Sequence, residues 1–159
     1  MTNRKYHLES ERRIFYSQNF LKNPEVVWKV LGKKCSLSPE DTVYEIGAGK
    51  GAITEILAKR CQRVVAIEID PNLYCFLKKK FAQTPNVEII QGDFLKQPLP
   101  RFPYKVFANP PFRIFSEIIR KLTETENPPE ATYLFAQKEA AQKFTGKPET
   151  TLMKQLTFF

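Results

Sequence analysis

The sequence is poor in the residues that build disulfide scaffolds and metal centres. It has only three cysteines and one histidine in 159 residues. Cys35, Cys61 and Cys75 are widely separated and odd in number, so they give neither a disulfide framework nor a zinc-binding pattern. We therefore expect buried or idle thiols in a reducing compartment and no bound metal. The single His7 lies in a polar stretch, which does not favour a metal-binding or catalytic role.

Long apolar runs are also absent. No stretch approaches the roughly 20 apolar residues that a helix needs to cross a bilayer. The N-terminus is polar and charged, unlike a signal peptide. Hydrophobic residues nevertheless make up 42% of the chain, which argues against wholesale disorder and suffices for one domain with a core. We expect a monomeric, cytoplasmic protein without membrane contact.

Positive charge is in excess, and it lies at the two ends of the chain. The net charge is +8. Residues 1–35 hold eight Lys and Arg against three Asp and Glu, residues 36–100 eight against eight, and residues 101–159 nine against six. This distribution fits a surface for a polyanion around a neutral small-molecule site, or a basic surface that serves only solubility. The candidate nucleic-acid contacts are Arg4, Lys5, Arg12, Arg13, Arg113, Arg120 and Lys121.

Apolar segments alternate in type along the chain after a basic arm over residues 1–22. Asn23-Pro24 has the form of a helix start. Strands are predicted over residues 42–46, 63–67, 87–90, 104–108 and 132–135, and helices over residues 52–60, 70–81, 114–123 and 137–144. This alternation predicts an α/β, Rossmann-like domain over residues 23–159, with a mostly parallel sheet covered on both faces. Residues 150–159 are half apolar and end on two aromatics, which suggests a domain cut before its last strands or a natural minimal domain.

A glycine-rich turn, Glu45-Ile-Gly-Ala-Gly-Lys-Gly51, follows the first predicted strand. Gly47 and Gly49 allow a tight turn and a close approach of the backbone to a ligand, although a purely structural turn explains them equally well. The turn is not G-x-G-x-x-G, which argues against a dinucleotide. Ala52 follows Gly51, so the sequence is not a Walker phosphate loop either.

Acidic residues follow the next two strands. Glu68 ends the second strand and can accept hydrogen bonds from both ribose hydroxyls of a nucleoside. Asp93 follows the third strand and can accept from an adenine amine, while Phe94 packs on the ring. Either acid alone is more often a solvated strand end. Together with the glycine turn they indicate a nucleoside cofactor.

The fourth strand ends in Asn109-Pro-Pro-Phe112. The exocyclic amine of adenine is a poor nucleophile, because its lone pair is delocalised into the ring. The side-chain oxygen of Asn109 and the backbone carbonyl of Pro110 can accept from both amine hydrogens and favour a pyramidal nitrogen. The prolines stiffen the loop, and Phe112 can stack on a flipped base. The alternative is a rigid turn with a buried Phe.

The order of these motifs resembles the rRNA adenine-N6 dimethyltransferase superfamily of class I methyltransferases. Within it, the chain resembles most the Erm enzymes of macrolide, lincosamide and streptogramin B resistance, with the housekeeping small-subunit dimethyladenosine transferases as near relatives. The motifs are Gln18-Asn-Phe-Leu21, Glu45-Ile-Gly-Ala-Gly-Lys-Gly51, Glu68-Ile-Asp70, Gly92-Asp-Phe-Leu95, Asn109-Pro-Pro-Phe112, Glu117-Ile-Ile-Arg-Lys121 and Gln137-Lys-Glu-Ala-Ala141.

The resemblance implies an S-adenosylmethionine-dependent transfer of methyl to an adenine N6 amine of 23S rRNA. It also implies the site residues. Residues lining the methionine end of the cofactor are Gln18, Asn19 and Leu21. The backbone can approach the cofactor at Gly47 and Gly49. Glu68 binds the ribose, Ile69 packs on the adenine and Asp93 binds the adenine amine. On the target side, Asn109 positions the amine and Phe112 stacks on the base.

The chain departs from the family pattern in two ways. Pro110 stands where the family usually has Ile or Leu, although its carbonyl is still available, and this Pro-Pro form keeps a DNA adenine methyltransferase as an alternative. The family has a helical C-terminal domain, which we expect this chain to lack, and this makes a non-catalytic RNA-binding fragment a further alternative.

Overall fold

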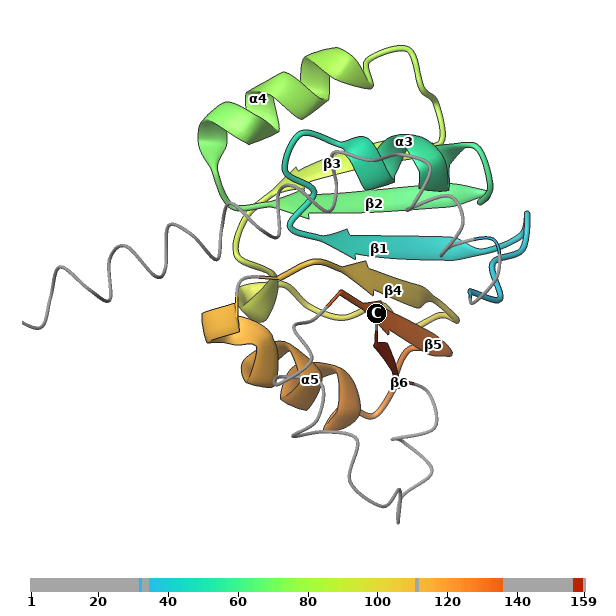
Figure 1. Ribbon diagram of the computed structural model, residues 1–159, viewed down its shortest axis with the longest axis vertical. Coiled ribbons are helices and arrows are strands. Elements are labelled where there is room, and N and C mark those ends of the chain that lie inside the picture. The colour runs from blue at the N-terminus through green and yellow to red at the C-terminus, as the bar shows by residue number, and fades with distance from the viewer. Residues whose placement is uncertain (1–31, 33–34, 111, 136–155, 159) are drawn as a thin grey trace, which may run out of the picture. The chain divides into compact units, whose positions relative to one another are not determined.

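The computed structural model describes residues 32, 35–110, 112–135 and 156–158. The chain divides into two compact units, Met1–Cys35 and Ser36–Phe159, and the second is described below. Its framework is a parallel sheet of six strands in the order β3-β2-β1-β4-β5-β6 (Figure 1). The predicted α/β class with a parallel sheet is therefore confirmed.

The observed elements follow the predicted alternation closely. The strands are β1 Thr42–Ile46, β2 Arg63–Glu68, β3 Val87–Gln91, β4 Lys105–Ala108, β5 Ala131–Leu134 and β6 Leu156–Phe158. The helices are α3 Ala52–Ala58, α4 Pro71–Lys80 and α5 Phe115–Thr123, with short 3₁₀ helices η1 Phe94–Lys96 and η2 Phe112–Ile114. Strand β6 and both 3₁₀ helices were not predicted from the sequence. The predicted basic arm, the helix start at Asn23 and the helix over residues 137–144 lie outside the described residues.

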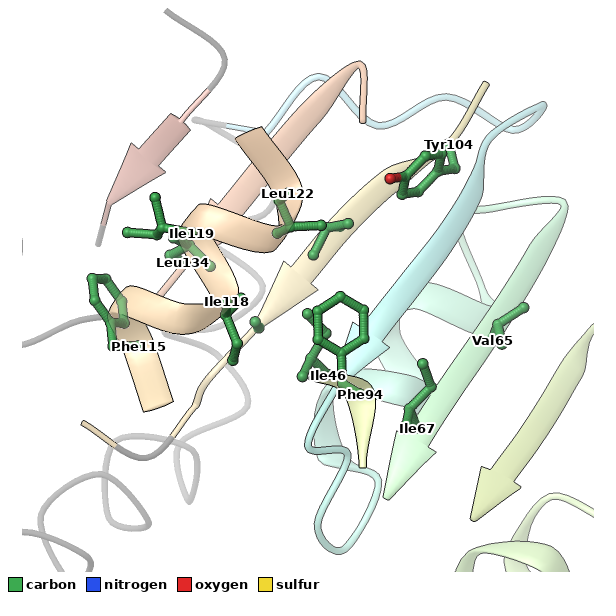
Figure 2. Close-up of a cluster of buried hydrophobic side chains, with 12 residues drawn as sticks. Ile46, Val65, Ile67, Phe94, Tyr104, Phe115, Ile118, Ile119, Leu122 and Leu134 are labelled. Atoms are coloured by element: carbon green, nitrogen blue, oxygen red, sulfur yellow. The ribbon is translucent and has the colours of Figure 1, made fainter. Parts of the chain in front are cut away.

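Helices α3 and α4 cover one face of the sheet and α5 covers the other (Figure 1). The buried side chains of α5 are Phe115, Ile118, Ile119 and Leu122, a spacing that places them on one side of a helix. They pack in one cluster with Val65 and Ile67 of β2 and with Leu134 of β5, as Figure 2 shows. Full burial of such a side chain contributes about 1.5–3 kcal/mol, so this cluster fixes α5 against the sheet.

The opposite face has its own smaller cluster. Ala66 of β2 and Ile89 of β3 pack there against Leu77 of α4 and Phe81. Helix α4 begins where the sequence predicts: the carboxylate of Asp70 accepts hydrogen bonds from the first backbone N–H groups of the helix, and a proline occupies the first turn. None of the described helices is long and apolar enough to cross a membrane.

The strand order reverses next to β1. The chain moves from β1 outward to β2 and β3, and then returns to place β4 on the other side of β1. In open parallel sheets, ligands bind outside the carboxyl ends of the strands at such a reversal. A ligand-binding site is therefore expected at this edge, between β1 and β4.

Candidate functional site

The predicted cofactor and target motifs meet at the carboxyl edge of the sheet. Ile46 of β1 is paired with Ile67 of β2 on one side and with Ala108 of β4 on the other, while Glu68 is paired with Gln91 of β3. The four strands therefore end at nearly the same level. Strands lie about 4.8 Å apart, so the loops after β3 and β4 are about 14 Å from each other along this edge.

The glycine turn combines a strained backbone with open space. Gly47 and Gly49 have φ values of 74° and 58°, in the left-handed region where other residues are disfavoured. A Cβ atom at either position would meet no other atom within 4 Å, so the space beside the turn is open. Gly51 is different, because a Cβ atom there would lie 2.6 Å from Cε2 of Phe81 and 2.8 Å from Cδ2 of Leu77. Two glycines thus face a potential ligand, and the third allows α4 to pack closely.

Glu68 connects the end of β2 to the glycine turn. Its Oε2 accepts a hydrogen bond from the backbone N–H of Gly49 at 2.8 Å, and its Oε1 accepts from the backbone N–H of Asp70 at 3.0 Å. The residue is only 5% exposed. Each carboxylate oxygen has a second lone pair, so both oxygens keep an acceptor position for ribose hydroxyls. Beside it, Ile69 is 65% exposed and offers an apolar surface.

Glu45, the first residue of the glycine motif, is buried below the turn. The hydroxyl of Thr54 in α3 donates to its Oε2 at 2.5 Å. The pKa of Glu45 is raised to about 8, chiefly by burial, while the Thr54 hydrogen bond opposes this rise and the nearby charge of Glu68 contributes to it. Glu45 is therefore mostly protonated at neutral pH and acts as a neutral hydrogen-bonding group. The motif alone gave no sign of this.

Asp93 lies in the loop after β3 and caps η1. Its Oδ1 accepts from the backbone N–H of Leu95 at 3.0 Å, and the residue is half-buried. The next residue, Phe94, is 5% exposed and belongs to the core cluster under α5 (Figure 2). The ring therefore packs in the core, and its predicted contact with a cofactor stays a prediction.

On the target side, Asn109 and Pro110 directly follow β4 and are both half-buried. The amide of Asn109 makes no hydrogen bond to other residues that the structure describes. Phe112 begins η2, and its side chain lies outside the described part of the chain, as does Pro111. Gln18, Asn19 and Leu21 also lie outside the described residues, so their predicted roles stay predictions.

The candidate nucleic-acid residues differ in their surroundings. Arg4, Lys5, Arg12 and Arg13 lie outside the described residues. Arg113 is exposed, and the side chain of Arg120 is 67% exposed, with Glu124 at 4.0 Å. Arg120 and Lys121 line a shallow groove together with Leu95, Leu99, Glu117, Glu124, Thr125 and Glu126. The three glutamates make this groove unfavourable for a phosphate backbone, and the ammonium of Lys121 is bound within the protein.

Comparisons with known proteins agree with this arrangement. The family model described as ribosomal RNA adenine dimethylase matches residues 9–159. A probable dimethyladenosine transferase of Dictyostelium discoideum is 38% identical over 154 residues, which are 95% of this chain and 48% of that protein. The ribosomal RNA small subunit methyltransferase A of Dehalococcoides mccartyi (strain CBDB1) is 38% identical over 135 residues, 82% of this chain and 46% of that protein.

A solved structure shows the same fold. The crystal structure of the 23S rRNA methyltransferase ErmE matches with a TM-score of 0.66 and 33% identity, over 71% of this chain and 46% of that one. The chain thus spans about half the length of the curated relatives that it matches.

Proposed function

Because this chain belongs to the ribosomal RNA adenine dimethylase family, we propose that it transfers a methyl group from S-adenosylmethionine to the N6 amine of an adenine in ribosomal RNA. One observation carries this proposal. The open glycine turn, the buried Glu68, the Asp93 loop and the Asn109-Pro110 pair all lie at the ends of strands that finish at one edge of the sheet.

The cofactor part of the site fits a nucleoside attached to an amino acid. Gly47 and Gly49 leave open space beside the turn, and Glu68 keeps two acceptor positions for a pair of hydroxyls. Ile69 offers an exposed apolar side chain next to them for a purine ring. When bound, S-adenosylmethionine would supply an electrophilic methyl group on a sulfonium centre.

The target part of the site acts through hydrogen-bond acceptors. In the proposed mechanism the side-chain oxygen of Asn109 and the carbonyl of Pro110 accept from the two amine hydrogens. This directs the nitrogen lone pair out of the ring plane, toward the donor. Proline restricts the backbone at this position, so its carbonyl is held in place before the base arrives. Phe112 would stack on the target adenine.

The test is an Asn109→Ala variant assayed with labelled S-adenosylmethionine and total ribosomal RNA. We expect a rate of methyl transfer that is roughly 100-fold lower, since the acceptors act mainly in the transition state. Cofactor affinity, measured by calorimetry, should change by less than about threefold, because Asn109 is proposed to act on the target amine. Asn72→Ala, on the exposed side of α4, is the matched control and should keep the activity. Full activity of Asn109→Ala would refute the mechanism.

The target RNA is the finer part of the proposal. The Erm likeness, supported by the similarity to ErmE, favours 23S rRNA and a role in macrolide-type resistance. The name of the bacterial relative favours the small subunit. Separation of the labelled large- and small-subunit RNAs distinguishes the two targets. If the product is N6,N6-dimethyladenine, which has no amine hydrogen left for pairing, primer extension also stops just before the modified base. A stop in the large-subunit RNA supports the Erm-type role.

Two other functions are tested by the same samples. A DNA adenine methyltransferase, which the Pro110 form favours, would methylate a DNA oligonucleotide in preference to ribosomal RNA. A non-catalytic RNA-binding fragment would bind RNA in a salt-sensitive manner through its basic residues but would not bind S-adenosylmethionine. We expect a monomer that acts where ribosomes are, in the cytoplasm.

A further inference from the structure

Lys121 of α5 points into the protein and holds the loop that carries Asp93. Its Nζ donates hydrogen bonds to the backbone carbonyl oxygens of Leu95 at 2.8 Å and of Gln97 at 2.5 Å. The same ammonium lies 5.2 Å from the ring centre of Phe94, within the range of a cation–π contact. Three successive parts of one loop are thus bound by a single side chain from a helix more than twenty residues downstream.

The carbonyl groups that Lys121 binds need such a partner. Helix η1 is a single short turn, so the last carbonyls of this segment have no following helical N–H groups to bind them. At the other end of the turn, the side chain of Asp93 accepts from the backbone N–H of Leu95. The turn is therefore fixed at its start by Asp93 and at its end by Lys121. Loss of either contact would free the loop to move.

The position of Lys121 in the chain gives this contact a wider meaning. Helix α5 and the short η2 before it follow the Asn109-Pro110 loop, where the target amine is proposed to bind. Asp93 lies in the loop proposed to bind the adenine of the cofactor. The Lys121 contacts are the described hydrogen bonds that join helix α5 to that loop.

We propose that Lys121 is a positioning residue for cofactor recognition, which holds Asp93 where it can accept from the adenine amine. The inference rests on the proposed function and deepens it. It also gives Lys121 a role inside the protein in place of the predicted contact with RNA. Burial lowers the pKa of Lys121, and the nearby charge of Asp93 partly opposes this effect.

The side chain of the neighbouring Arg120 points in another direction, so the contacts with the loop after β3 are made by Lys121. Successive helical residues point about 100° apart, and Arg120 projects into solvent beside Glu124. Arginine would also be a poor substitute at position 121, because its planar guanidinium cannot match the two carbonyl directions of the compact ammonium.

The experiment compares two ligands in three proteins. S-adenosylhomocysteine carries the exocyclic amine that Asp93 is proposed to recognise, and S-inosylhomocysteine lacks it. Calorimetry gives the ratio of their affinities for the wild-type chain, for Lys121→Met and for Lys79→Met. Methionine keeps an apolar stem against Phe94 and removes only the ammonium. Lys79, exposed on α4, is the control for the loss of one positive charge.

We expect the wild-type chain and Lys79→Met to prefer the adenosyl ligand by about tenfold, the worth of one hydrogen bond to a charged group. Lys121→Met should reduce this preference to about threefold or less. If Lys121 served only general stability, both ligands would weaken equally and the ratio would stay the same. That result would overturn the proposal.

Hydrogen exchange of the amides at residues 94–97 gives a second measurement that needs no ligand. In Lys121→Met these amides should exchange roughly tenfold faster, because the loop has lost its fixed end. If the wild-type chain bound neither ligand while this effect appeared, the proposed function and the role in cofactor recognition would both fail, and Lys121 would only hold the loop in place. Unchanged exchange together with weaker binding of ribosomal RNA would return Lys121 to the RNA surface and refute the inference.

Discussion

Replacement of Glu45 by glutamine should remove a pH dependence that the wild-type protein shows. In the folded state the pKa of Glu45 is raised to about 8 by burial, whereas an unfolded chain has an ordinary pKa near 4.5. Between these values the folded protein holds a proton that the unfolded chain has lost. The free energy of unfolding therefore decreases as the pH rises through this window.

The size of the effect follows from the same linkage. While the folded state holds one extra proton, each pH unit costs about 1.4 kcal/mol of stability. Between about pH 5.5 and pH 7.5 the wild-type protein should thus lose about 2–3 kcal/mol relative to Glu45→Gln. Glutamine keeps the size of the side chain and an acceptor for the Thr54 hydroxyl. Other titrating groups near it, such as Glu68 and Lys80, are present in both proteins and largely cancel.

The assay is urea unfolding of both proteins at several pH values, followed by the circular dichroism of the helices. The quantity of interest is the difference in unfolding free energy between the two proteins, plotted against pH. A constant difference across the window would show that Glu45 is ionised in the folded state. The description of Glu45 as a buried neutral group would then be wrong.

Two further predictions concern stability and are also measured by urea unfolding. Gly51→Ala should lower the free energy of unfolding by about 2–4 kcal/mol, because it combines a left-handed backbone with a clash against α4. Gly47→Ala should lower it by only about 1 kcal/mol, because the space beside Gly47 is open. Equal losses in the two variants would contradict that open space. Lys105→Met should lower the free energy of unfolding by about 2–3 kcal/mol, because it leaves the mostly buried carboxylate of Asp41 without its ion pair at 2.7 Å. The double variant Lys105→Met, Asp41→Asn should regain part of this stability, and a double variant as unstable as Lys105→Met would contradict the role of the unpaired carboxylate.

The parts of the fold that sequence predicts well are those governed by neighbouring residues. Asp70 and Pro71 start α4 because a side-chain acceptor and a fixed φ act within one turn. Strand β1 was predicted to the residue, since Thr42–Ile46 is short, apolar and followed at once by a glycine turn. Glu68 was correctly placed at a strand end for the same local reason.

What the sequence could not predict depends on contacts between distant residues. Strand β6 exists because it pairs with β5, and its three residues carry no strong pattern of their own. A lysine on a helix usually faces water. The ammonium of Lys121 instead binds the backbone carbonyls of Leu95 and Gln97, because the loop after β3 packs beside α5. The position of Phe94 next to Asp93 predicts a contact with a ligand, but the sequence alone does not show that its ring also packs in the core cluster under α5.

The reversal of strand order next to β1 also has a consequence for how such a protein can change over generations. Apart from Gln18, Asn19 and Leu21, the groups proposed to bind the methyl donor come from one continuous stretch, residues 47–93, while those proposed to choose the acceptor follow β4. A lineage can therefore exchange its target by mutations in the second stretch and inherit the donor site intact. Lys121 is the exception, since it belongs to the second stretch and serves the first. Drift at that position would be constrained by the donor even when the target changes.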